Sequence, residues 1–163
     1  MKYRCLTDEE LQELETELVQ FLIANGVDGP DWKRLNEVHP DRALRLVEIF
    51  SEQVFDKIIS DAKFMLHIGP QSLFAFHCEA DLIHLMGLKV VGKTVNLQDE
   101  PYLSQPAKIF EQIPAANLQL FHQSKAYQPD RSLELFRMLE NNIHITDGQT
   151  YRLLEELYEK SAG

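Results

Sequence analysis

Residues 63–91, KFMLHIGPQSLFAFHCEADLIHLMGLKVV, decide the fold of this chain. Their apolar residues come in short runs of strand length, and turn residues such as Gly69-Pro70 separate the runs. This pattern predicts three strands, at residues 63–68, 73–78 and 82–91.

The connections between these runs are too short for a parallel sheet. A parallel crossover needs about a dozen or more residues, and only residues 69–72 and 79–81 are available here. The three strands therefore form an antiparallel meander. Apolar side chains alternate onto both faces, as in Leu73 and Phe74, so helices or another layer are expected to cover both sides.

The chain before the strands has helical periodicity. Thr7 and Glu10 have the spacing of a capping box, and Gly26 suits the left-handed position that ends a helix. Pro30 fits the first turn of a short helix and Pro40 the start of a longer one. We predict helices at residues 7–25, from residue 30, and at about 40–62.

The pattern after Gly92 is weaker. It predicts a short strand near residues 94–97, a short helix at 106–112, a fourth strand at 118–127, a helix at 130–140 and a last helix after Thr146, which has capping-box spacing to Gln149. The predicted fold class is α+β, with N-terminal helices packed on an antiparallel meander and further helices in the C-terminal third. A length of 163 residues fits one domain, residues 1–163.

Composition restricts the classes of partner and compartment. Twenty-six acidic and sixteen basic residues give a formal charge of −10, which opposes phosphate binding, so no nucleic-acid partner is predicted. No apolar run is long enough to span a bilayer, and the N-terminus lacks an apolar signal segment. Cys5 and Cys78 are too few for a disulfide framework. We predict a cytoplasmic protein with no membrane partner.

The candidate ligand-binding residues are His77, His84 and Lys63. If Glu79 and Ala80 form a two-residue loop, His84 pairs with the residue two before His77, and both imidazoles lie on one face as diagonal neighbours. A shift of one residue in register separates them. Lys63 would join them from the neighbouring strand.

Such a histidine pair could bind an anion, a metal or a proton. Two imidazoles alone make an incomplete zinc site, and each ring could instead be satisfied by a neighbour or by solvent. Glu79 and Asp81 are interpreted as solvated carboxylates of the turn. No metal, no cofactor and no catalytic residue is predicted.

Two further patterns in the sequence bear on catalysis or nucleotide binding. Residues 87–94, GLKVVGKT, match the phosphate-loop string GxxxxGK[ST], but a true phosphate loop leaves a strand and opens a helix. The following residues 95–101 are poor helix formers, so nucleotide binding is the weakest hypothesis. Ser72 and Ser124 lack a Gly-x-Ser-x-Gly context, so the sequence supports no hydrolase nucleophile.

Several short motifs together resemble a family of uncharacterised bacterial proteins, a domain of unknown function. The resemblance covers nearly the whole chain and rests on residues 1–4, 6–7, 62–64, 74–77 and 145–148 with Tyr151. It implies a small bacterial cytoplasmic protein, and it brings no activity, cofactor or site residue.

Two hypotheses about function follow. The first is a non-enzymatic binding or regulatory module that recognises a protein partner or a small ligand. The sequence favours it because helix and strand patterns are clear throughout, whereas no recognisable set of catalytic residues is present. The alternative is a small enzyme or metal-binding protein that uses the pair His77 and His84 on the sheet face. The sequence leaves the ligand and the oligomeric state open.

Overall fold

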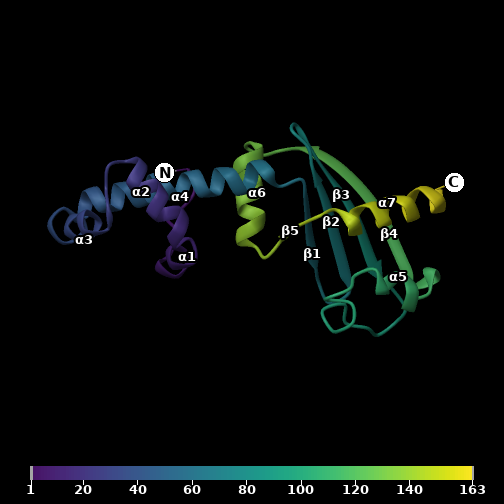
Figure 1. The fold of residues 1–163 in the computed structure, drawn as a ribbon. Coiled ribbons are helices and arrows are strands. Elements are labelled where there is room, and N and C mark those ends of the chain that lie inside the picture. The colour runs from purple at the N-terminus through teal and green to yellow at the C-terminus, as the bar shows by residue number, and fades with distance from the viewer. Residues whose placement is uncertain (1, 163) are drawn as a thin grey trace. The chain divides into compact units, whose positions relative to one another are not determined.

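The structure, a computed structural model, describes residues 2–162. The chain divides into two compact units, residues 1–60 and residues 61–163, which we call the helical unit and the sheet unit (Figure 1). That all 163 residues form one domain stays a prediction.

The helical unit is built from four helices in the described residues. They are α1 (Asp8–Glu13), α2 (Glu15–Ala24), α3 (Gly29–Val38) and α4 (Pro40–Asp61), whose last residue belongs to the sheet unit. The single helix predicted over residues 7–25 is wrong in one respect, because the chain breaks at Leu14, where φ is −103° and ψ is 24°. The capping box of Thr7 and Glu10 is confirmed.

Aromatic side chains hold α2 against α4. The rings of Phe21 and Phe50 lie 5.3 Å apart, and Phe50 is buried. Ser51 is fully buried, and its hydroxyl accepts a hydrogen bond of 2.9 Å from the backbone N–H of Leu6. The buried polar group is thus satisfied, as buried polar groups generally are, and it ties the N-terminal segment to α4.

Glu10 makes the helical unit sensitive to acid. Its hydrogen bond from the Arg4 guanidinium, with a second from the Thr7 backbone, lowers the pKa of its carboxyl to about 2. A folded-state pKa below the ordinary 4.5 stabilises the fold above that pH, and the contribution is lost as the pH falls from there through 2. We expect this contribution to the free energy of unfolding to be about 1 kcal/mol, because the ion pair of Arg4 and Glu10 is partly exposed.

Urea unfolding between pH 5 and pH 2.5 measures this effect. Glu10→Gln is expected to flatten the pH dependence by that amount. Glu13→Gln, an exposed glutamate of the same helix, is the matched control and should leave the dependence unchanged. Parallel pH profiles for wild type and Glu10→Gln would contradict the assignment.

The sheet unit contains one antiparallel sheet of five strands in the described residues. The strands are β1 (Phe64–Ile68), β2 (Ser72–Cys78), β3 (Leu82–Val90), β4 (Leu118–Ala126) and β5 (His144–Thr146), in the spatial order β4-β3-β2-β1-β5. The predicted meander and the fourth strand are confirmed. The strand predicted near residues 94–97 is wrong: this segment is a loop, and the buried Leu97 donates its N–H to the Pro70 carbonyl at 2.7 Å.

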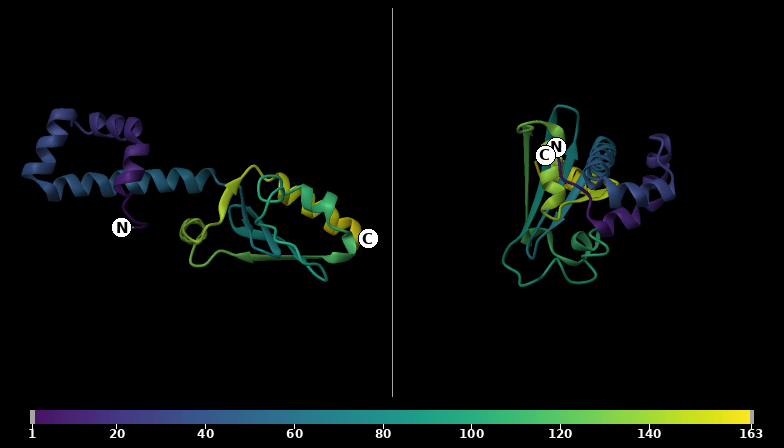
Figure 2. Two further views of the ribbon diagram at one scale, coloured as in Figure 1. Left: turned by 90° about the horizontal axis from the view of Figure 1, so that it is seen from below. Right: turned by 90° about the vertical axis from the view of Figure 1, so that its left-hand side faces the viewer.

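Helices cover parts of both faces of this sheet. The helices of the unit are α5 (Lys108–Gln112), α6 (Arg131–Glu140) and α7 (Gln149–Ala162), with a short 3-10 turn, η1 (Ala115–Asn117). Figures 1 and 2 show α7 lying across one face, where Leu154 is fully buried. We call this side the α7 face. Met138 of α6 lines a cavity together with Phe76 and Leu85, which point to the opposite face.

The predicted α+β class is thus confirmed. No helix in the described part of the chain is long and apolar enough to cross a bilayer.

Candidate functional site

The β2–β3 hairpin brings the two predicted histidines into direct opposition. His77 pairs with His84, and their ring centroids lie 5.9 Å apart. The two-residue loop is Ala80-Asp81, because the N–H of Glu79 donates to the Leu82 carbonyl at 3.0 Å. The predicted pairing is therefore wrong by two residues, and since two is an even shift, both imidazoles stay on one face.

The next strand adds two polar side chains to the same face. Ser124 of β4 pairs with His84, and His122 pairs with Met86. Side chains of directly paired residues point to one side of a sheet. The strands thus place His77, His84, Ser124 and His122 together at one end of the α7 face.

Glu79, His84 and Ser124 form a hydrogen-bonded chain. The Oε2 atom of Glu79 lies 2.8 Å from Nε2 of His84, and Nδ1 of His84 lies 2.6 Å from Oγ of Ser124. The bond from His84 lowers the pKa of Glu79. An ionised carboxylate can only accept, so Nε2 of His84 donates to it. When the ring carries this one proton alone, Nδ1 accepts the proton of the Ser124 hydroxyl.

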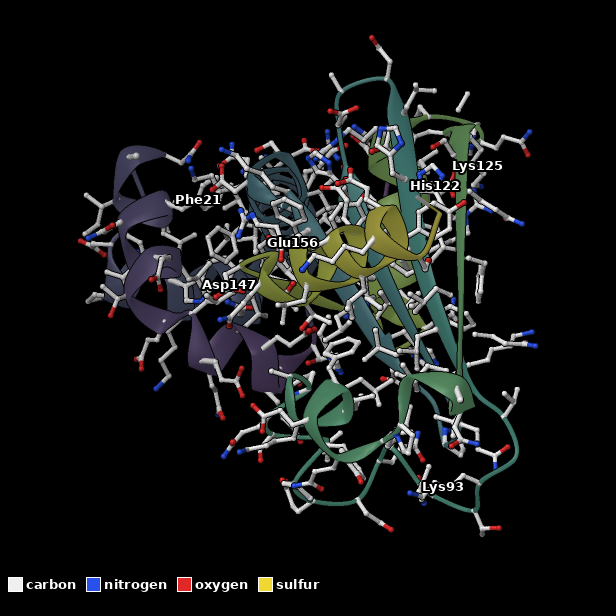
Figure 3. All side chains as sticks on the ribbon, turned by 90° about the vertical axis from the view of Figure 1, so that its right-hand side faces the viewer. Phe21, Lys93, His122, Lys125, Asp147 and Glu156 are labelled. Carbon is white, nitrogen blue, oxygen red and sulfur yellow. The ribbon has the colours of Figure 1, made fainter. Side chains whose placement is uncertain are left out.

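His122 lies on the solvent side of this chain. Its Nε2 is 3.4 Å from Oγ of Ser124, and its ring is 6.0 Å from that of Tyr158 on α7. Both His122 and Ser124 are exposed, whereas the side chain of His84 is 22% exposed. Figure 3 shows His122 and Lys125 at one end of the sheet and Lys93 in the loop at the other end. The serine hydroxyl is therefore open to an incoming molecule.

His77 has a different environment. Its ring stacks on Phe64 with centroids 4.6 Å apart, and Tyr151 of α7 lies 5.5 Å away. Burial raises the pKa of Tyr151 to about 12, which keeps that phenol protonated. His77 therefore packs in an aromatic group beside the polar chain and forms no hydrogen bond with another described residue.

Lys63 does not join the histidines. Its carbonyl accepts the N–H of Cys78 at 2.8 Å, so Lys63 lies opposite Cys78, and Phe64 is the residue that pairs with His77. Strand alternation directs Lys63 to the other face. Of the three predicted residues, the structure brings two together.

The metal and nucleotide hypotheses gain no support. Residues 2–162 contain no group of three or more His, Cys, Asp and Glu side chains that could hold a metal ion. The loop that contains Gly92, Lys93 and Thr94 opens no helix, so the phosphate-loop hypothesis is wrong.

Gly87, the first glycine of that string, is required for packing and not for phosphate binding. A Cβ there would lie 2.0 Å from the ring of Phe121 on β4.

β4 lies at the edge of the sheet. Its pairing with β3 fixes which of its backbone groups point away from the sheet. The N–H of Val91 donates to the Asn117 carbonyl at 2.8 Å, and the N–H of Val90 donates away from β4, to Gln71. Bonded and non-bonded pairs alternate along an antiparallel ladder. The backbone N–H and C=O groups of β4 that point to the free edge are therefore those of Leu120, His122, Ser124 and Ala126. The N–H of Leu118 instead donates to the Ala115 carbonyl.

A cavity of about 420 Å³ adjoins this edge on the α7 face. Apolar side chains make up most of its lining: Phe110, Ile113, Leu118, Leu120 and Leu157. Lys160 of α7 also lines it and forms no ion pair with a described carboxylate. On the α7 face, β4 thus contributes Leu118 and Leu120 to an apolar cavity, and farther along the same strand it carries the polar side chains of His122 and Ser124.

The sequence did not identify Ser124, His122 or Glu79 as partners of His84. Ser124 has no nucleophile motif around it, and the position of Glu79 in a turn predicts a solvated carboxylate. The only available signal was alternation: His122 and Ser124 are two residues apart, so they share a face of any strand that contains them.

A family model, "Family of unknown function (DUF6495)", matches residues 1–159. The comparisons with curated proteins and with solved structures give no match.

Proposed function

The chain belongs to this family of unknown function, and we propose that it binds an extended segment of a partner protein, which adds as a strand to the edge of β4. The observation that carries the proposal is the set of outward backbone groups at Leu120, His122, Ser124 and Ala126, on a strand that also lines an apolar cavity. Strand addition to a sheet edge is a common mode of peptide recognition, in which backbone bonds give affinity and side-chain pockets give specificity.

The edge of β4 lacks the usual protection against pairing. Natural edge strands are short, bulged, or broken by proline and by charged side chains. β4 is nine residues long, LQLFHQSKA, without proline or glycine. Its single charged side chain, Lys125, is paired with Glu134 at 2.6 Å. An exposed edge of this length is suited to a partner strand.

The lining of the cavity indicates which side chains a partner segment would carry. Alternate side chains of an added strand point to the α7 face, where the cavity has room for a large apolar side chain. The Lys160 ammonium at the cavity favours a carboxylate nearby. We therefore expect an extended segment with an apolar residue and an acidic residue. Because the chain as a whole carries a net charge of −10, Lys160 provides local positive charge on an otherwise acidic protein.

The compartment is part of the proposal. We infer a bacterial cytoplasmic protein that acts on a protein partner and binds neither nucleic acid nor membrane. The thiols of Cys5 and Cys78, both free, support a reducing compartment. Fractionation of cells that express the chain tests this assignment.

Selection of ten-residue peptides from a random display library, with the full chain as bait, tests the proposed function. The selected peptides are expected to share an apolar residue and a nearby acidic residue. In fluorescence anisotropy with the synthetic consensus peptide, Lys160→Glu should raise Kd about fivefold, or about 1 kcal/mol. Glu156→Lys, which reverses a charge on α7 outside the cavity lining, is the control and should not weaken binding.

Two outcomes would overturn this proposal. One is a set of selected peptides whose affinity does not respond to Lys160→Glu. The other is a chain that is a dimer by light scattering and that His122→Pro converts to a monomer, because a second copy would then occupy the β4 edge.

A further inference from the structure

We propose that Ser124 is a nucleophile for acyl transfer from small esters, with His84 as its general base and Glu79 as the positioning residue. The activity goes beyond strand addition and does not depend on it. Its basis is the chain Glu79–His84–Ser124, with distances of 2.8 Å and 2.6 Å between the bonded atoms. A nucleophile bonded to a base that a third group orients is the recurring geometry of such sites.

The backbone fixes this geometry. His84 and Ser124 are directly paired on β3 and β4, at a non-bonded position of the ladder, where opposed side chains approach most closely. Glu79 reaches Nε2 from the β2–β3 hairpin and leaves Nδ1 to accept from the hydroxyl. In this ring orientation a neutral His84 donates from Nε2 to Glu79 and accepts at Nδ1 from Ser124.

Two hydrogen-bond donors lie beside the hydroxyl. The His122 Nε2, which donates in the tautomer that carries its proton there, is 3.4 Å from Oγ. The N–H of Ser124 itself points to the free edge of β4. Donors placed where negative charge develops on a substrate carbonyl oxygen stabilise an acyl-transfer transition state. The open sheet surface around His122 and Ser124 admits a small ester.

The reaction is a balanced ester hydrolysis. Oγ of Ser124 attacks the ester carbonyl carbon while its proton passes to Nδ1 of His84, so the Oγ–C bond forms. The bond from that carbon to the leaving oxygen then breaks, and His84 returns the proton to the departing alcohol. Water attacks the acyl carbon in turn, gives a proton to His84, and releases the carboxylic acid as the Oγ–C bond breaks and Oγ regains its proton.

Labelling with a fluorophosphonate probe tests the nucleophile directly. The probe forms an Oγ–P bond and releases fluoride, and intact-mass spectrometry with peptide mapping reports the labelled residue. We expect labelling at Ser124, none there in Ser124→Ala, and a rate lower by about a hundredfold in His84→Gln, in line with the loss of a general base. Glu79→Gln should slow labelling about tenfold.

Ser104 provides a matched control. Its hydroxyl bonds to the Glu100 carboxylate with no imidazole between them, so Ser104→Ala should leave labelling unchanged. Circular dichroism checks that each variant is folded. No label on the folded wild type, label on another serine, or equal rates for wild type and His84→Gln would overturn the proposal. Peptide affinity of Ser124→Ala reports separately on strand addition and should be retained.

Discussion

Replacing Gly148 with alanine is expected to destabilise the sheet unit by about 3 kcal/mol, through backbone strain and overpacking together. Gly148 precedes α7 with φ of 88°, a conformation that L residues rarely adopt, and a Cβ there would lie 2.5 Å from Cδ2 of Phe64. Phe64 is the ring on which His77 stacks. The substitution would therefore displace a partly buried ring that packs against the core, as well as strain the start of α7.

Gly26 is the matched control for this substitution. It has φ of 79°, but nothing lies within 4 Å of the position of its Cβ. Gly26→Ala should therefore cost the backbone strain alone, about 1 kcal/mol. Urea unfolding followed by circular dichroism measures both variants. Equal losses for the two would show that the contact with Phe64 contributes nothing.

Leu154→Ala is expected to cost about 3 kcal/mol, the usual range for a buried leucine that leaves a cavity. Leu154 is fully buried in the core that α7 forms with the sheet, together with Leu73 and Leu88. Leu153→Ala, at the half-buried neighbouring position, should cost less than half as much. Similar losses at the two positions in urea unfolding would contradict the packing of α7 on the sheet.

The strands of the meander could be predicted because their signals are local. Short turns at residues 69–71 and 79–81 separate runs of apolar residues, and the observed strands begin and end within one residue of the prediction. β5 was missed because three residues carry no pattern of their own and their partner, β1, is far away in the chain. The spacing of apolar residues near Leu97 favours a strand, but a loop whose Leu97 side chain is buried in the core has the same spacing.

The candidate site was predictable only in part. Alternation placed His77 and His84 on one face, and the even register error preserved that result. The hydrogen bonds to His84 depend on pairing between β3 and β4, which joins residues forty positions apart in the sequence. No local signal in a single sequence fixes such a register. The same limitation led to the prediction that Lys63 lies beside the pair.

The strand-addition and nucleophile proposals meet at Ser124. The outward N–H of Ser124 belongs to the edge that a partner strand would bond, and its hydroxyl belongs to the chain with His84. A bound segment would cover the hydroxyl, so the consensus peptide is expected to slow labelling of Ser124. Activity and strand addition would then be mutually exclusive on one molecule.

Amide hydrogen exchange of the full chain, measured by NMR with and without the consensus peptide, tests the central claim most directly. The account predicts new protection in alternation along β4, at the N–H groups of Leu120, His122, Ser124 and Ala126. The intervening amides of Gln119, Phe121 and Gln123 already donate to β3 and should change little. Unchanged exchange at the four outward amides in the peptide-bound protein would contradict strand addition to β4.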